Sequence, residues 1–307
     1  MQPSKGLIIA SFFSIYVIWG STYLFNKIAV SEISPLFLGA IRFSISGILI
    51  MIISILMKFS LKITKKQFIN LEISGFLFLV FGNGVFAWAL IYVDSSFGAL
   101  MASTQPLFVL FLLRLIDGKK LQKKSIIGVV FGVIGMLLLV TQQEITTSEE
   151  SLLGVFMMLS CILSWSYGSV FVSKSDLPKN FFVSTGYQML IASALLFTTS
   201  FLFKEEHFSP FQWSSKVQVS VVVLIVFGSI IAFTAFNYLL KTVSPEKVAT
   251  SAYVNPIIAM FLGWYVLDEQ LSLQSIIASL ILLLGVYFIN SRKEVSKTKV
   301  TTKPQKI

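Results

Sequence analysis

Uncharged, apolar stretches of about 20 residues recur along almost the whole chain, and they limit its fold more than any other feature. A helix of that length crosses a hydrocarbon layer of roughly 30 Å. Composition agrees, because 55% of the 307 residues are hydrophobic and only 12% are charged, whereas soluble domains carry about 25% charge. We therefore predict an all-α polytopic membrane protein.

Ten transmembrane helices are predicted, since a membrane β-barrel would show weaker, alternating segments of about ten residues. A cleaved signal peptide is not favoured, because the first apolar run continues past Gly20 without a small-x-small cleavage site. The predicted spans are Gly6–Asn26, Pro35–Met57, Ile73–Val93, Ser95–Leu113, Ser125–Thr141, Ser151–Ser173, Phe181–Phe203, Val217–Leu240, Val248–Leu267 and Leu273–Asn290.

The net charge of +10 would suggest nucleic acid as a partner if the protein were soluble. With ten spans and a cytoplasmic N-terminus, however, every Lys and Arg lies on the cytoplasmic side except Lys27, Arg42, Lys204 and Lys216. This distribution follows the positive-inside rule. The basic residues thus indicate topology in the cell (cytoplasmic) membrane with both termini cytoplasmic, and nucleic acid is not expected as a partner.

A proline-centred segment occurs twice, because Ala99 to Leu139 aligns without a gap on Ala249 to Ile289. Pro106 and Pro256 fall on each other in this alignment. The repeat unit is predicted to be five helices, over residues 1–142 and 151–290, followed by a basic cytoplasmic tail at 291–307. An odd number of crossings inverts the second copy relative to the first, which is the architecture of carriers that work by alternating access.

Motifs for other chemistries are missing from the sequence. It has no Walker A run, no Gly-rich dinucleotide loop and no cluster of metal ligands, and its single His207 falls in a predicted loop. The single cysteine, Cys161, excludes an intramolecular disulfide. We expect no enzyme activity, no cofactor and no metal.

Several segments in this order resemble the EamA-type transporters of the drug/metabolite transporter superfamily, over about Gly6 to Asn290. The resemblance implies a ten-helix inner-membrane carrier, frequently an exporter of amino acids or other small metabolites. It departs from the family pattern at Lys119, which stands where the repeat places Glu269, and after Gly84, where a polar pair found in close relatives is replaced by apolar residues. The segments are Trp19-Gly20-Ser21-Thr22, Pro35 to Phe43, Gly82-Asn83-Gly84, Ala99 to Leu107, Asn255-Pro256 and Asp268-Glu269.

Arg42 is the only full charge well inside a predicted span, where a cation costs about 2.5 to 3.5 kcal/mol to insert. It could bind a carboxylate or phosphate of a substrate. Alternatively, it could extend to the outer interface or pair with Glu32 or Asp94.

Pro106 and Pro256 are expected to kink spans four and nine and to act as hinges, since proline frees the carbonyl oxygen four residues earlier. A static kink is the alternative. Polar and aromatic side chains within spans are further candidates for the substrate cavity, with interhelical hydrogen bonds or packing as the alternative. They are Asn83, Trp88, Ser103, Thr104, Gln105, Trp165, Tyr187, Gln188, Asn237, Tyr253 and Asn255.

None of the fourteen acidic residues falls deep inside a predicted span, so a buried proton relay is not expected. We predict a secondary transporter of small metabolites driven by the substrate gradient, with protons as a second possibility for coupling. An intramembrane enzyme or flippase for a lipid-linked substrate and a non-transporting sensor are the alternatives. The oligomeric state stays open, because Gly128 and Gly132 could support either a dimer face or packing within one bundle.

Overall fold

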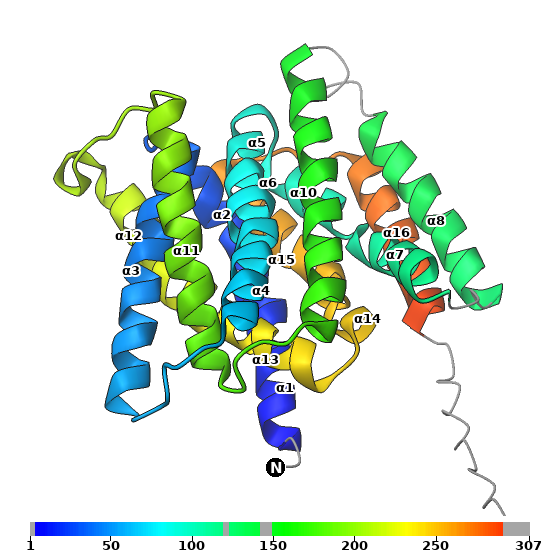
Figure 1. Ribbon diagram of the computed structural model, residues 1–307. Helices are drawn as coiled ribbons and strands as arrows, with labels where there is room; N and C mark the ends of the chain where they lie inside the picture. The colour runs from blue at the N-terminus through cyan, green and yellow to red at the C-terminus, as the bar shows by residue number, and fades with distance from the viewer. Residues whose placement is uncertain (1–3, 119–122, 142–148, 291–307) are drawn as a thin grey trace, which may run out of the picture.

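The computed structural model describes residues 4–118, 123–141 and 149–290. Within these ranges it is a bundle of helices with no strand (Figure 1). The fold class is therefore all-helical, as predicted. The predicted tail at 291–307 and Lys119 lie outside the described residues.

The helices follow one another along the chain as separate straight segments and as longer composite ones. Three segments, labelled η1, η2 and η4, are π-helical. In order, the elements are α1 Lys5–Phe13, η1 Ser14–Ile18, α2 Trp19–Ala29, α3 Pro35–Leu56, α4 Lys65–Gly75, η2 Phe76–Val85, α5 Phe86–Tyr92, α6 Ser95–Ala102, α7 Gln105–Asp117, α8 Lys123–Val140, α10 Glu149–Lys174, α11 Phe181–Leu202, η3 Pro210–Gln212, α12 Ser215–Val223, η4 Leu224–Phe233, α13 Thr234–Thr242, α14 Pro245–Val248, α15 Ser251–Leu267 and α16 Leu273–Asn290.

The predicted spans fall mainly on helix, but the described part of the chain contains 7 helices long and apolar enough to cross a membrane, not ten. Large apolar side chains such as Leu56 and Leu280 face outward and are more than half exposed, as expected for surface in contact with lipid. The 7 are Lys5–Ala29, Pro35–Leu56, Lys65–Tyr92, Ser95–Ile116, Glu149–Lys174, Phe181–Leu202 and Ser215–Thr242, and shorter apolar helices cover Ile126–Gly135, Val254–Leu267 and Leu273–Gly285.

The third helix begins earlier than its apolar run, at Lys65 rather than at the predicted Ile73. Thr64 forms a capping box with Gln67, in which each side chain accepts a hydrogen bond from the other residue's backbone N–H at 3.1 Å. This cap satisfies backbone donors that the first turn leaves open. The prediction from hydropathy left out the first two turns of this helix, because Lys65 and Lys66 lower the mean hydropathy of that segment.

Two pairs of helices pack along each other, α3 with α11 and α8 with α16 (Figure 1). In the second pair the backbones approach so closely that a Cβ on Gly285 would lie 2.8 Å from the carbonyl oxygen of Gly128. Glycine is required at such a crossing. The Gly128 and Gly132 spacing therefore serves packing within the bundle.

Corresponding helices in the two parts of the chain end with a residue in the same left-handed backbone conformation. Within the described ranges, positive φ angles occur at Lys58 (57°) and Lys204 (55°), which end α3 and α11, and at Gly118 (63°) and Asp268 (55°), which end α7 and α15. A left-handed residue after a helix satisfies its last carbonyl groups. Each pair occupies corresponding positions in the two predicted repeats.

The helices that carry the predicted hinges differ in detail. The first is interrupted at Ser103 and Thr104, so that Pro106 stands in the first turn of α7. The second is interrupted at Ala249 and Thr250, and Pro256 lies inside α15. The two prolines correspond in sequence, but the breaks do not.

Candidate functional site

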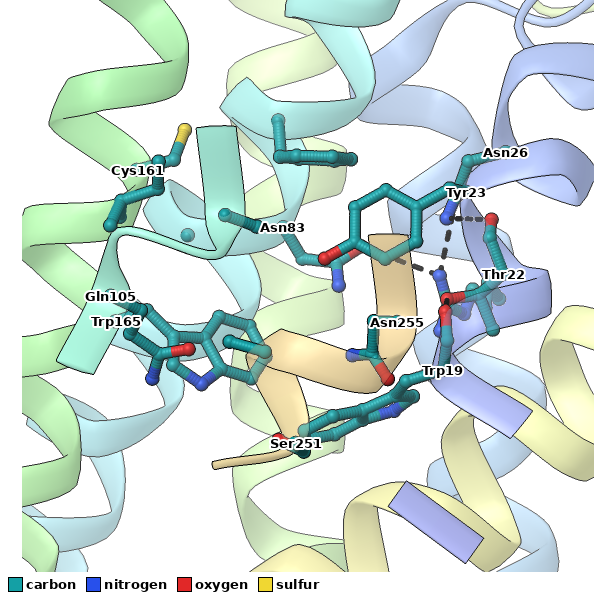
Figure 2. A pocket seen from close by; sticks show the side chains of 16 residues that line it. Trp19, Thr22, Tyr23, Asn26, Asn83, Gln105, Cys161, Trp165, Ser251 and Asn255 are labelled. Atoms are coloured by element: carbon teal, nitrogen blue, oxygen red, sulfur yellow. Dashed lines mark hydrogen bonds between the residues drawn. The ribbon is translucent and has the colours of Figure 1, made fainter. Parts of the chain in front are cut away.

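A cavity of about 100 Å³ lies between helices from both parts of the chain, and we call it the central cavity. Figure 2 shows side chains from different helices converging on it. Its lining is Trp19, Thr22, Tyr23 and Asn26 of α2, Arg42 of α3, Gly82 and Asn83 of η2, Phe86 of α5, Ala102 of α6, Gln105 of α7, Cys161, Ile162 and Trp165 of α10, and Ser251, Ala252 and Asn255 of α15.

Arg42 provides the positive charge of the central cavity and is only 4% exposed. Its Nε donates to Ser229 Oγ at 2.7 Å, and its Nη1 donates to Asn83 Oδ1 at 3.3 Å and Asn26 Oδ1 at 3.4 Å. The guanidinium also lies 5.1 Å from the Phe43 ring centre. Among the described residues all of its partners are neutral.

This arrangement excludes both alternative explanations of Arg42. A buried guanidinium does not extend to the interface, and no described carboxylate pairs with it. Glu32 instead accepts a hydrogen bond from the Ser214 backbone N–H at 2.8 Å, which holds the pKa of the Glu32 carboxyl below its usual value. A buried, unpaired cation carries a desolvation cost of several kcal/mol, which neutral partners offset only in part. An anion entering the cavity would supply the missing charge.

Two partners of Arg42 come from π-helical segments, Asn83 from η2 and Ser229 from η4. π-Helical turns are rare and are frequent at functional sites. Gly228 precedes Ser229, and a Cβ at that position would lie 3.0 Å from Arg42 Nη2. The glycine therefore leaves room for the guanidinium.

Asn255 joins α15 to the first helix at the cavity wall. The carbonyl oxygens of Ile15 and Tyr16 in η1 face its side chain, and its amide nitrogen, turned toward these acceptors, donates to Tyr16 O at 2.8 Å. The Tyr16 hydroxyl also lies 2.6 Å from Thr250 Oγ1. The polar residue before Pro256 therefore binds the first helix where its backbone is π-helical.

A group of aromatic rings closes one side of the central cavity, and we call it the aromatic barrier. It consists of Trp19, Phe78, Trp165, Phe233 and Phe236. Ring centres are 4.9 Å apart for Trp19 and Phe236, 5.6 Å for Trp19 and Trp165, and 5.0 Å for Phe78 and Trp165. Side chains from four separate helices thus form one continuous apolar layer.

Glu269, which follows α15, binds the first residues of α6. Its Oε1 accepts from Ser95 N at 3.0 Å and from Ser95 Oγ at 2.6 Å. Its Oε2 accepts from Ser96 N at 3.1 Å and from the Ser96 hydroxyl. A carboxylate at a helix N-terminus is favoured by the helix dipole and by the open N–H groups. This contact ties the end of α15 to α6.

The structure brings some of the predicted cavity residues together and separates others. Arg42, Asn83, Gln105, Trp165 and Asn255 line the central cavity. The side chain of Tyr253 lies outside the described residues. The other candidates lie elsewhere. Trp88 packs on Phe203, while the hydroxyls of Ser103 and Thr104 donate to carbonyl oxygens of α6. Tyr187 donates to Leu61 O, and the side chains of Gln188 and Asn237 are hydrogen-bonded to each other.

The main group that sequence reasoning missed is on α2. Thr22, Tyr23 and Asn26 line the cavity, and so does Trp19, which in the sequence stands out only as part of a family-like segment. Spacings of three and four residues place them on one helical face. A polar stripe in an otherwise apolar span was the signal that could have identified them.

A polar cavity enclosed by membrane-length helices defines a multi-pass membrane protein with the features of a transport protein. The chain belongs to the EamA-like transporter family, whose model matches residues 5–141 and again 152–291. It is 30% identical over 298 residues to the uncharacterized inner membrane transporter YedA of Escherichia coli K12, covering 97% of this chain and 95% of that protein.

More distant relatives agree with this family. The uncharacterized transporter YoaV of Bacillus subtilis 168 is 22% identical over 291 residues, covering 94% of this chain and 99% of YoaV. A protein crystal structure superposes with a TM-score of 0.71 at 19% identity, covering 94% of this chain and 97% of that one. This structural similarity supports the fold alone.

Cys161 provides a direct test of the central cavity, because it is the only cysteine of the chain and lines the cavity beside Trp165. We expect small thiol reagents to react slowly with this buried thiol and to inhibit transport. An anionic methanethiosulfonate should react faster than a cationic one of the same size, since Arg42 faces the same space. Inhibition of flux and mass spectrometry of the labelled protein measure both effects.

Cys161→Ser is the control for this labelling, and should transport normally and resist both reagents. Full labelling of the native protein without loss of flux would show that Cys161 lies off the substrate path.

Proposed function

We propose that the protein is a secondary transporter that exports small metabolites such as amino acids or related amphipathic compounds. In this proposal ten helices cross the cell membrane, both termini are cytoplasmic, and two inverted five-helix repeats, 1–142 and 151–290, alternate access to the central cavity. The family supports transport of a small molecule across a membrane. Export, substrate class and mechanism are our proposals.

Several observations support the repeats. The family model matches the chain twice, and the matches fall on the two proposed units. The shorter apolar helices would supply the crossings beyond the seven long ones. The pairs Lys58 with Lys204 and Gly118 with Asp268 give equivalent helices the same ending. Opposite orientation of the halves would explain why cations gather on one predicted side.

The observation that carries the proposed substrate class is Arg42 in the central cavity with neutral partners only. A carboxylate would complete this site through charge-assisted hydrogen bonds. Asn83 and Asn255 can bind a second polar group, and the Trp19 and Trp165 rings provide an apolar wall. A zwitterion or anion with a small apolar part fits this combination.

The size of the central cavity supports a small substrate. Its volume of about 100 Å³ is below that of an engineered cavity of about 150 Å³ that binds benzene. A small amino acid is of this scale, whereas a lipid-linked molecule is much larger. The transporter proposal is therefore favoured over a flippase.

The lining of the central cavity also bears on energy coupling. It contains no Asp or Glu among the described residues, so a proton would find no carboxylate beside the substrate. We propose that the substrate gradient drives export. Proton coupling, for which carboxylates near helix ends such as Asp94, Asp268 or Glu269 are the candidates, is the second possibility.

Reconstituted flux tests this proposal. We expect metabolomics of cells with and without the protein to show carboxylate-bearing metabolites shifted from the interior to the medium. In proteoliposomes, the purified protein should carry these compounds down their gradients, and an imposed pH gradient should drive no uphill flux. Vesicles made with Arg114→Gln, which changes an exposed arginine at the end of α7, serve as a folded control.

The outcomes separate the parts of this proposal. Uphill flux that follows the pH gradient would establish proton coupling instead. An unchanged metabolite profile together with no flux of any tested amino or organic acid would exclude this substrate class.

A further inference from the structure

A second cavity, of about 460 Å³, is lined in part by Ser4 and Leu7. These residues lie at the end of the bundle where the chain begins (Figure 1). We call this second cavity the Lys179 cavity. It lies between α1, the segment joining α10 to α11, and α13. Leu177 and Phe181 give it an apolar wall, and Lys179 and Lys241 place two ammonium groups at its edge.

Two residues that line this cavity each carry an oxygen that is enclosed by the protein and has no hydrogen-bond partner in the described structure: Asn237 Oδ1 and the Tyr238 hydroxyl. A ligand in the cavity would reach them once the side chains that cover them move. The Asn237 amide is fixed, since its Nδ2 donates to Gln188 Oε1 at 2.8 Å and to Thr185 Oγ1 at 3.1 Å. Its Oδ1 is left to accept from another donor. Buried polar atoms without partners are rare in folded proteins, and each requires an explanation, such as a functional role, a water or an ion.

The cations and the two oxygens form a complementary set. Ammonium groups and a tyrosine hydroxyl donate to a carboxylate, while an amide oxygen accepts from an ammonium group. Lys241 Nζ already donates to Ser175 O at 2.7 Å and keeps further donors for a ligand. The apolar wall suits an aliphatic side chain. A small amino acid combines these features in one molecule.

The aromatic barrier adjoins the central cavity through Trp19 and Trp165, and it reaches the residue before Asn237, which lines the Lys179 cavity. Phe236 is the neighbour of Asn237 in α13, and its ring packs on Trp19 and Trp165, which line the central cavity. The Tyr238 ring packs on Phe181, at 5.3 Å between centres, on the side of the Lys179 cavity. A rearrangement of these rings would connect the two spaces.

The other end of the bundle has a corresponding cavity of about 250 Å³, lined by Lys27, Tyr92, Ser96 and Glu269. It adjoins the turn between α5 and α6, as the Lys179 cavity adjoins the turn between α13 and α14. The turns share one backbone form, with φ −135° and ψ 160° at Val93 and φ −131° and ψ 167° at Val243. The two cavities therefore adjoin turns of the same form in the two proposed repeats, and Glu269, which binds α6, lines one of them.

We infer that the Lys179 cavity is the first binding site for the transported molecule on the cytoplasmic side, where Lys179, Lys241 and the Tyr238 hydroxyl bind its carboxylate and Asn237 Oδ1 binds its amino group. This inference rests on the proposed export of small amino acids. The aromatic barrier then separates recognition from passage into the central cavity.

The experiment measures KM separately from each face, in inside-out and right-side-out vesicles. The probes are ¹⁴C-labelled amino acids with small or aliphatic side chains, each measured separately. For Lys179→Gln combined with Lys241→Gln, KM from the cytoplasmic face should rise about tenfold, since charge-assisted hydrogen bonds are lost. KM from the outer face and the maximal rate should stay near wild type. Lys216→Gln, which changes an exposed lysine of α12, should alter neither.

Tyr238→Phe is the variant least able to disturb folding, because it keeps the ring on Phe181 and removes only the hydroxyl. It should also raise the cytoplasmic KM several-fold. An unpartnered hydroxyl without a ligand could be removed with no effect on transport. Unchanged KM in both variants would overturn the inference while leaving the proposed function intact.

Two further outcomes would also overturn it. If wild-type vesicles carry none of the probes, the proposed function fails for amino acids, and this assignment of the cavity fails with it. If the variants differ from wild type only in vesicles containing phosphatidylglycerol, and not in pure phosphatidylcholine, the cavity binds a lipid headgroup.

Discussion

Arg42→Gln is expected to lower the flux of carboxylate-bearing substrates about 100-fold or more, without lowering the thermal stability of the protein. The loss of flux follows from removing the only cation among the residues that line the central cavity. The stability follows from burial, because the charge has no ionic partner in the described structure, and glutamine needs no costly desolvation. Initial rates in proteoliposomes and Tm in detergent measure the two quantities.

This combination distinguishes a binding role from a structural one. A purely structural arginine would lose Tm together with flux, whereas a binding arginine loses flux alone, because the glutamine amide can still donate to Asn26, Asn83 or Ser229. Ser229→Ala is the matched variant, because it removes one neutral partner and keeps the charge. We expect it to retain most of the flux. Normal transport by Arg42→Gln would show that the guanidinium does not bind substrate.

The membrane helices could be predicted from the sequence because one physical requirement dominates each of them. A span must be long and apolar, and its backbone must be satisfied internally, so hydropathy locates it. The errors occur where another interaction takes over. At Thr64 a capping box starts the helix two turns before the apolar run. At Ser103 and Thr104 the helix breaks before Pro106, while its counterpart breaks well before Pro256.

The site was predictable only in part, for a similar reason. Arg42 stands out in any hydropathy reading, because nothing else in its span is charged. Its partners do not, since Ser229 is ordinary in sequence and becomes significant through the π-helical turn that places it 2.7 Å from Arg42 Nε. Contacts between residues far apart in sequence depend on how the helices cross. Trp88 and Tyr187 show the converse, being aromatic candidates that pack elsewhere.

Glu269 illustrates how an asymmetry in sequence acquires a structural meaning. The repeat places Lys119 at the matching position, which marked Glu269 as unusual without giving its partner. In the structure Glu269 is 8% exposed, and its carboxylate accepts four hydrogen bonds from Ser95 and Ser96. These join the loop after α15 to the first turn of α6. The bond set therefore closes the bundle at the end opposite the Lys179 cavity.

Glu269→Gln should weaken this closure strongly. An amide presents one oxygen where the carboxylate presents two, and its NH₂ group would face donors of Ser96. Loss of these bonds is expected to cost about 1–3 kcal/mol, which lowers Tm by several degrees. If the closure belongs to the transport cycle, flux should also fall about tenfold, and Cys161 should react faster with thiol reagents added from the outer face. Melting curves, initial rates and labelling rates test the three effects.

The neighbouring Asp268→Asn is a matched control, because it removes an exposed charge one residue away and asparagine tolerates the left-handed backbone that Asp268 adopts at φ 55°. It should leave Tm and Cys161 labelling unchanged. A double-mutant cycle of Glu269→Gln with Ser96→Ala should give a coupling energy within about 0.5–3 kcal/mol. If Glu269→Gln lowers Tm but neither flux nor labelling changes, Glu269 only stabilises the bundle. If all three change together and the cycle shows coupling, the contact between α15 and α6 is a gate that a carboxylate on a helix N-terminus holds closed.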